Sequence, residues 1–82
     1  MTVIFTEHAK NQLTERRLSK AFVLTVIRNP SLVKKQKDER LQFIKRFKQT
    51  GKIFLLICIV EKSVDILKVI TVFKTSKVKK YL

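Results

Sequence analysis

The spacing of hydrophobic residues changes near residue 30 and divides the chain into two parts. In the first part, Ala9 and Leu13 lie four positions apart. Further along, four apolar residues share one stripe at helical spacing: Phe22, Val23, Val26 and Ile27. Intervals of three and four place such residues on one side of a helix, so the pattern predicts helices over residues 7–16 and 20–28.

Capping residues stand where these two helices should begin. The hydroxyls of Thr6 and Ser19 can accept hydrogen bonds from the backbone N–H groups of a first helical turn. Asn29-Pro30 should end the second helix, because proline cannot continue a helix and disfavours α geometry in the residue before it. The short apolar segment at residues 3–5 precedes the first cap and is predicted to be a strand.

After Pro30 the pattern becomes typical of strands. Residues 40–48 partly alternate between apolar and basic positions, which indicates a strand with one apolar and one basic face, although Ile44 and Lys45 interrupt the alternation. The apolar run at residues 53–60 suits a central strand buried on both faces. The other predicted strands are residues 32–36 and 66–74.

This order of elements, β-α-α-β-β-β-β, predicts an α+β fold. Helices that precede a run of strands favour two N-terminal helices packed on an antiparallel sheet of four to five strands. At 82 residues the chain has the length of one domain, which would span residues 1–82. Residues 75–82 form a basic tail that could contain a short helix capped by Ser76.

Charge is the strongest compositional signal. Nineteen Lys and Arg residues face six Asp and Glu residues, giving a net charge of +13. The part up to Arg40 carries +5 and the part after it +8, so both halves are basic. Self-repulsion of this size favours a polyanionic or acidic partner. General solubility and heat adaptation are the alternatives, but heat adaptation usually enriches Glu together with Lys.

The rest of the composition excludes several classes of protein. The single cysteine, Cys58, cannot form an intramolecular disulfide, which favours a cytoplasmic protein and a buried structural thiol. The longest apolar run has eight residues, whereas a membrane span needs roughly twenty. One Gly, one His and one Cys supply neither a Gly-rich phosphate loop nor a zinc site. We therefore expect no membrane association, no signal peptide, no metal and no cofactor.

Several short motifs resemble a small uncharacterised family related to the BrnT toxins. The N-terminal segment of proteins in that family is similar to Phe5-Thr6-Glu7-His8-Ala9 of this chain, followed by Leu13, Arg16, Leu18 and Ser19. Further matches are Asn29-Pro30, Arg46-Phe47, Ile70-Thr71-Val72-Phe73 and Lys80-Tyr81. Two positions depart from the family pattern: Gln12, where Arg is frequent, and Arg17, where Gly is usual. The order of elements also resembles that of the RelE and ParE toxins.

The resemblance implies a RelE-like fold and a toxin that is paired with an acidic antitoxin and cleaves or binds RNA. RNA cleavage without a metal must deprotonate the 2′-hydroxyl, stabilise the phosphorane and protonate the leaving oxygen. The candidate catalytic residues are Arg46, Tyr81 and His8. The candidate RNA-binding residues are Arg40, Lys48, Lys52, Lys68 and Arg16.

Each candidate also has a structural interpretation. His8 could bond neighbouring backbone at a helix start, Arg16 could interact with the negative end of the first helix, and Tyr81 could pack the tail. The basic strand positions could form a solvated face, and the Phe residues on apolar faces are interpreted as core before stacking platforms.

Three functional hypotheses follow. The first is a metal-independent endoribonuclease toxin that acts on mRNA, including mRNA on the ribosome. The second is a non-catalytic nucleic-acid-binding module, such as a degenerate toxin or a mobile-element protein. The third is an interaction protein whose basic face docks an acidic antitoxin or another protein. A homodimer is also possible.

Overall fold

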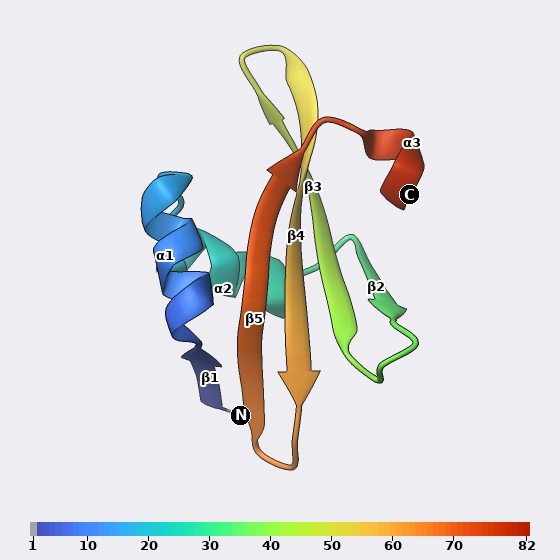
Figure 1. Ribbon diagram of the computed structural model, residues 1–82. Coiled ribbons are helices and arrows are strands. Elements are labelled where there is room, and N and C mark those ends of the chain that lie inside the picture. Colours follow the sequence, from blue (N-terminus) through green and yellow to red (C-terminus); the bar gives the residue numbers. More distant parts are fainter. Residues whose placement is uncertain (1) are drawn as a thin grey trace.

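The computed structural model describes residues 2–82, and its five strands form one sheet with helices on both faces (Figure 1). The elements are β1 (Thr2–Phe5), α1 (Glu7–Glu15), α2 (Lys20–Arg28), β2 (Leu32–Lys35), β3 (Leu41–Gln49), β4 (Lys52–Lys62), β5 (Ile66–Thr75) and α3 (Val78–Tyr81). The predicted α+β class and the order of the first seven elements are confirmed.

The sheet is mixed, so the prediction of an antiparallel sheet is wrong at one edge. The strand order is β1-β5-β4-β3-β2. Strands β2 to β5 follow one another through short turns, and each pairs antiparallel with the next. Strand β1 instead runs parallel to β5, with Val3 opposite Leu67. Parallel neighbours need a long connection, and here α1, α2 and the other three strands lie between the two in the sequence.

Both long helices begin at the predicted caps. The Thr6 hydroxyl accepts a hydrogen bond from the Ala9 N–H at 3.1 Å, and the Ser19 hydroxyl accepts one from the Phe22 N–H at 3.1 Å. Helix α2 has the predicted bounds, and α1 ends one residue earlier than predicted. Arg17 follows the end of α1 with a φ of +54°, the left-handed conformation that commonly terminates helices.

The two faces of the sheet carry separate apolar clusters. Helices α1 and α2 cover the first face, which we call the helix face, where Ala9 and Val23 pack against strand residues such as Leu56 and Val69. The opposite face, which we call the open face, holds the buried residues Ile44, Leu55 and Ile57 of β3 and β4. Strand β4 therefore contributes to both clusters, as predicted for a central strand. Ile44, which interrupts the alternation of β3 in the sequence, is a core residue of the open face.

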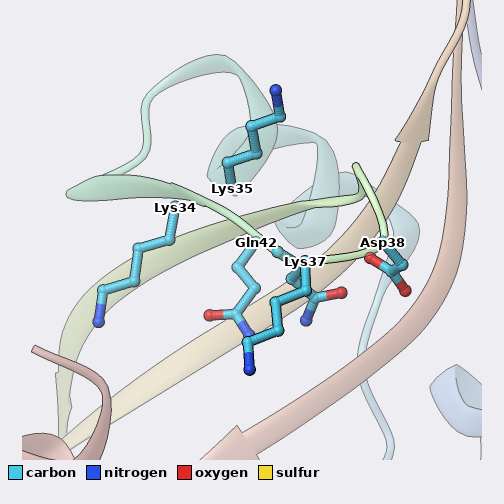
Figure 2. A pocket seen from close by; sticks show the side chains of 6 residues that line it. Lys34, Lys35, Lys37, Asp38 and Gln42 are labelled. Atoms are coloured by element: carbon cyan, nitrogen blue, oxygen red, sulfur yellow. The ribbon is translucent and has the colours of Figure 1, made fainter.

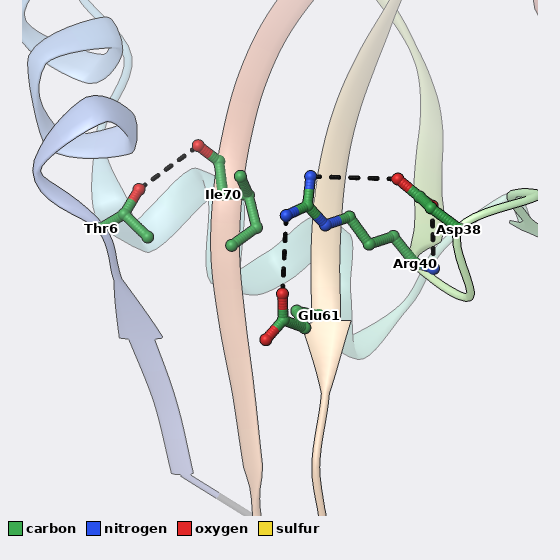
Figure 3. Close-up of polar contacts among 5 residues, drawn as sticks. All are labelled: Thr6, Asp38, Arg40, Glu61 and Ile70. Atoms are coloured by element: carbon green, nitrogen blue, oxygen red, sulfur yellow. Dashed lines mark hydrogen bonds and ion pairs between the residues drawn. The ribbon is translucent and has the colours of Figure 1, made fainter.

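Helix α1 completes the edge of β5 beyond the end of β1. The Thr6 N–H donates to the Val69 carbonyl at 3.1 Å, and the Thr6 hydroxyl donates to the Ile70 carbonyl at 3.3 Å (Figure 3). One turn further along α1, the buried Gln12 side chain accepts a hydrogen bond from the Val72 N–H at 2.7 Å. Thr6, at the N-cap of α1, and Gln12 thus form hydrogen bonds with backbone groups of β5 that a longer β1 would have paired.

The C-terminal helix α3 is a single turn of four residues that lies on the open-face side of the sheet (Figure 1). Its cap is Lys77, which makes no side-chain capping hydrogen bond, so the prediction that Ser76 caps it is wrong. The Val78 N–H donates instead to the backbone carbonyl of Ser76 at 2.9 Å. Packing of Val78 and Tyr81 on the sheet holds this turn in place.

Candidate functional site

The open face has an apolar centre that α3 covers in part. Val78 and Tyr81 pack on the cluster formed by Ile44, Leu55 and Ile57. The ring of Tyr81 meets that of Phe73 edge to face, with centroids 5.9 Å apart and an interplanar angle of 61°. Both rings remain partly accessible to solvent. A half-exposed pair of aromatic rings therefore lies on the outer surface of the sheet.

Basic side chains from the strands share the open face with this aromatic pair. Arg46 and Lys48 alternate with Phe47 in β3, so both point to the open face, as Ile44 does. Both side chains are exposed. The backbone N–H of Arg46 donates to the Ser31 hydroxyl at 3.0 Å, which ties this part of β3 to the loop before β2. Lys68 of β5 lies between Leu67 and Val69 of the helix face and so points to the open face.

The β2–β3 hairpin extends the positive surface to the edge of the sheet. A shallow hollow of about 460 Å³ is lined there by Lys34, Lys35, Gln36, Lys37, Asp38 and Gln42. In Figure 2, the side chains of Lys34, Lys37 and Gln42 point to one side of the hairpin and Lys35 points to the other. Lys34 pairs with Gln42 across the strands, and Gln42 has the parity of Ile44, so these side chains belong to the open face.

Arg40 does not carry a free charge on this surface, because two carboxylates engage it (Figure 3). Its guanidinium lies 3.9 Å from the Asp38 carboxylate and 3.6 Å from the Glu61 carboxylate. All three side chains are partly exposed to solvent, so these ion pairs contribute little to stability. Their effect on the site is electrostatic: Arg40 offsets the charges of Asp38 and Glu61 and is itself less available to a phosphate.

Few of the basic residues are neutralised within the described part of the chain. Over residues 2–82, the ion pairs engage only Lys10, Lys35 and Arg40, leaving the other sixteen Lys and Arg side chains without an acidic partner. The bond from Glu39 raises the pKa of the Lys35 ammonium, both as a hydrogen bond and through its charge. The surface is therefore strongly positive at neutral pH.

A family model described as "Domain of unknown function (DUF4258)" matches residues 5–74, which span the chain from the end of β1 to the end of β5. The chain belongs to the DUF4258 family. Comparison with curated proteins and with solved structures gave no match. The family description carries no link to RelE, ParE or BrnT toxins, so that resemblance stays a prediction. Arg46 and His8 lie inside the matched DUF4258 region, whereas Tyr81 lies beyond it.

The predicted site residues of this DUF4258 chain do not all come together. Arg46, Tyr81, Lys48 and Lys68 share the open face. His8 is exposed on α1, which packs on the opposite face. A site built on Arg46 and Tyr81 therefore does not include His8. Arg40 lies at the margin of the open face, where it forms ion pairs with Asp38 and Glu61.

The two remaining predicted residues lie on the helix-face side. Arg16 is the C-cap of α1. Lys52 opens β4 opposite Gln49, two residues before Phe54, whose ring stacks on the helix-face residue Phe47. Neither side chain belongs to the surface around Arg46. The spacing of residues in the sequence could not show on which face Lys52 lies, because that assignment requires the register between β3 and β4.

Two groups of polar residues were missed by sequence reasoning. Lys34 joins the open face only through the register of β2 on β3, and Lys37 points to the same side of the hairpin (Figure 2). Gln49 and Lys74 line a groove on the other side of the molecule, together with Arg16 and Arg17 from a distant part of the sequence. The aromatic rings beside them pack on the helix-face core, as the sequence predicts, but Phe22 and Phe47 also remain partly exposed.

Cys58 has the structural role predicted for it. Its side chain is fully buried in the helix-face cluster, and this burial raises the pKa of the thiol to about 12. A thiol in that state does not act as a nucleophile at neutral pH. Among residues 2–82 there is no cluster of three or more His, Cys, Asp or Glu side chains suited to a metal ion, and no helix with the length and apolar character of a membrane span.

Proposed function

We propose that this DUF4258 domain binds RNA on the open face of its sheet. The observation that carries the proposal is that cations without acidic partners share one face of the sheet with an aromatic pair. Arg46, Lys48 and Lys68 lie on the same face as Tyr81 and Phe73. Sugar-phosphate backbones bind to Lys and Arg side chains, and unstacked bases bind to accessible aromatic rings on a sheet.

The geometry of β3 supports contact with a single strand. Arg46 and Lys48 are two residues apart on one strand, which separates their Cα atoms by about 7 Å. Their long side chains can therefore reach consecutive phosphates of one extended strand. Lys34 and Lys37 continue the positive surface toward the β2 edge, in the direction that such a strand would follow. A guanidinium can also bond a phosphate with two N–H groups, which makes Arg46 the strongest single contact we expect.

The test is a titration of the protein with a fluorescently labelled single-stranded RNA of mixed sequence at several salt concentrations. Bound phosphates release counterions, so log K should fall linearly with log salt, with a slope of about −0.7 for each neutralised phosphate. Arg46→Ala should weaken binding severalfold and reduce the steepness of the slope by about 0.7. Arg28→Ala is the matched control, since it removes an exposed arginine at the end of α2, on the other side of the sheet.

Two results would contradict this assignment. RNA binding that is absent, or that does not depend on salt, would exclude the open face as a phosphate site. Equal losses in Arg46→Ala and Arg28→Ala would show that net charge alone drives binding, without a specific surface. Circular dichroism spectra of both variants establish that each one is folded before the comparison is made.

The presence of Arg46 and Tyr81 on one face also favours a more specific proposal, a RelE- or BrnT-like toxin that cleaves mRNA. In that mechanism Arg46 would stabilise the charge on the phosphorane and Tyr81 would position a base by stacking. Induced expression in a bacterial host should then arrest growth while primer extension shows new mRNA ends. Arg46→Ala should relieve the arrest. Normal growth with intact mRNA, from folded protein, would leave RNA binding without cleavage.

The same surface is where an acidic antitoxin would bind. An acidic polypeptide and an RNA strand would neutralise the same side chains, Arg46 and Lys48, so each should exclude the other. Competition is measured by adding a candidate acidic polypeptide to the preformed complex with labelled RNA. Release of the RNA supports a shared surface, and formation of a ternary complex would place the polypeptide elsewhere.

A further inference from the structure

A groove lies on the helix side of the molecule, away from the open face. It forms where the end of α1 and the start of α2 approach the upper ends of β3 and β5 in Figure 1. Its volume is about 500 Å³, within the roughly 300–1,000 Å³ typical of small-molecule sites. The lining residues are Arg16, Arg17, Leu18, Ser19, Phe22, Phe47, Gln49 and Lys74.

Every charged residue that lines this groove is basic. Arg16 and Arg17 come from the α1–α2 link, and Lys74 faces them from the end of β5. The Lys74 ammonium is held in place by a 3.3 Å hydrogen bond to the Gln49 side chain and lies 4.9 Å from the centroid of the Phe54 ring. Ser19 places the N-terminus of α2, with its partial positive charge, at the same location. The groove therefore attracts an anion.

Aromatic rings form the apolar part of the lining. Phe22 and Phe47 meet edge to face, with centroids 5.3 Å apart, and Phe47 stacks on Phe54 at 5.9 Å. All three side chains are only partly buried. A flat heteroaromatic ring can lie against such a surface, and this contact tolerates any base because every base has a π face.

The Arg17 side chain is available to a ligand in this groove. Its backbone terminates α1 with a φ of +54°, in the left-handed region that favours glycine. No hydrogen bond or ion pair of the described chain involves the Arg17 side chain, which is exposed and lines the groove. A guanidinium in this position can bond a phosphate with two N–H groups.

We propose that this groove binds a nucleoside phosphate, with the phosphate on Arg16, Arg17 and Lys74 and the base against Phe22 and Phe47. The three cations and the rings line one hollow, so a ligand that combines an anion with a flat ring fits it better than either part alone. The ligand could be a free mononucleotide or a nucleotide at the end of a bound RNA. The proposal does not depend on RNA binding at the open face, since it involves different residues on the other side of the sheet.

The test is isothermal titration calorimetry of the full chain with 5′-AMP, GMP, CMP and UMP, and with adenosine and inorganic phosphate as partial ligands. We expect 1:1 binding of the mononucleotides, with adenosine and phosphate each at least tenfold weaker. Arg17→Gly should reduce mononucleotide affinity about tenfold, as expected for loss of a charged hydrogen bond. This variant relieves the backbone strain at position 17, so loss of binding cannot be attributed to unfolding.

Further variants separate the two parts of the site and control for net charge. Phe47→Leu keeps an apolar side chain but removes the flat ring, so it should weaken mononucleotides and leave phosphate unchanged. Arg28→Ala, at the other end of α2, should bind mononucleotides like the parent. No binding at millimolar mononucleotide, or equal affinities for the parent and Arg17→Gly, would overturn the proposal. Phosphate alone binding as tightly as AMP would overturn the assignment of a nucleoside.

Repeating the RNA titration with Arg17→Gly shows whether the ligand is a free mononucleotide or a nucleotide of a bound RNA. Unchanged RNA affinity together with reduced AMP affinity identifies a site for free mononucleotides. A parallel loss of both affinities identifies the groove as the site for a nucleotide of the RNA itself. If mononucleotides bind and RNA does not, the groove proposal holds while the function proposed for the open face fails.

Discussion

Gln12 offers the sharpest test of how this fold is held together. It is the only buried polar side chain of the described chain, with 8% of its surface exposed, and its Oε1 accepts a hydrogen bond from the Val72 N–H at 2.7 Å. Because that N–H points away from β4, no neighbouring strand can satisfy it once Gln12 is lost. Substitution by methionine keeps the length of the side chain and its helix propensity but removes the amide acceptor.

The expected loss can be estimated from the fate of the Val72 N–H. A buried donor left without a partner costs about 1–3 kcal/mol, and burial of the more apolar methionine offsets part of this. We therefore expect Gln12→Met to lower the free energy of unfolding by about 1–2 kcal/mol. For a domain of this size, each kcal/mol corresponds to a fall in Tm of about 4–8 °C.

Urea unfolding followed by far-UV circular dichroism measures this loss, and Asn11→Met is the control. Asn11 lies on the exposed side of α1, so the same new side chain there should change stability by less than about 0.5 kcal/mol. Hydrogen exchange distinguishes a local from a global effect, since the Val72 amide should lose more protection than the amide of Cys58 in the central strand. A loss below about 0.5 kcal/mol for Gln12→Met would refute the argument that α1 completes the edge of β5.

Three further predictions concern backbone conformation and the buried thiol. Arg17→Gly should raise the free energy of unfolding by up to about 1 kcal/mol, because Arg17 has a φ of +54°; a loss of stability in urea unfolding would contradict this. Gly51→Ala should lower it by about 1 kcal/mol, although no atom lies within 4 Å of the added Cβ, because the φ of +79° disfavours any side chain; unchanged stability would show that the turn adapts. The raised pKa of Cys58 should make stability fall above pH 9, where the unfolded thiol ionises and the folded thiol, with a pKa of about 12, stays protonated. The slope should be steeper in the parent than in Cys58→Ala by about 1.4 kcal/mol per pH unit, and identical slopes would exclude a contribution from the thiol.

The helices could be predicted from the sequence because their signals are local. Thr6 and Ser19 lie next to the turns they cap, and the apolar stripe of α2 lies within nine residues. The strands could be located for the same reason, through alternation and the continuous apolar run of β4. The direction of β1 could not be predicted, because residues 3–5 do not indicate which strand they will pair with. Its partner, β5, begins about sixty residues later, and both helices lie between the two strands in the sequence.

The candidate site was predictable in composition but not in arrangement. Alternation alone placed Arg46 and Lys48 on one face of β3. Assigning Lys68 to that face requires the course of β5, which is irregular where Ile59 pairs with Thr71 and Val60 pairs with Val69. The role of Gln12 was also hidden, since the family resemblance marked this position only as a departure. The pairing of distant segments decides the positions of Lys68 and Gln12. Local patterns of residues along the sequence do not reveal that pairing.

The two faces of the sheet differ in how completely the chain covers them, and this difference bears on the partner proposed for the open face. Helices α1 and α2, of nine residues each, enclose the helix-face cluster, whereas α3 provides one turn over the open face. A second copy of the chain is a poor cover for it, because each copy carries a net charge of +13 and would bring its own Arg46 and Lys48 to the interface. The anionic partner proposed above would bury the same apolar centre and neutralise the cations on that face. The electrostatics of the open face thus favour RNA or an acidic polypeptide over self-association at this surface.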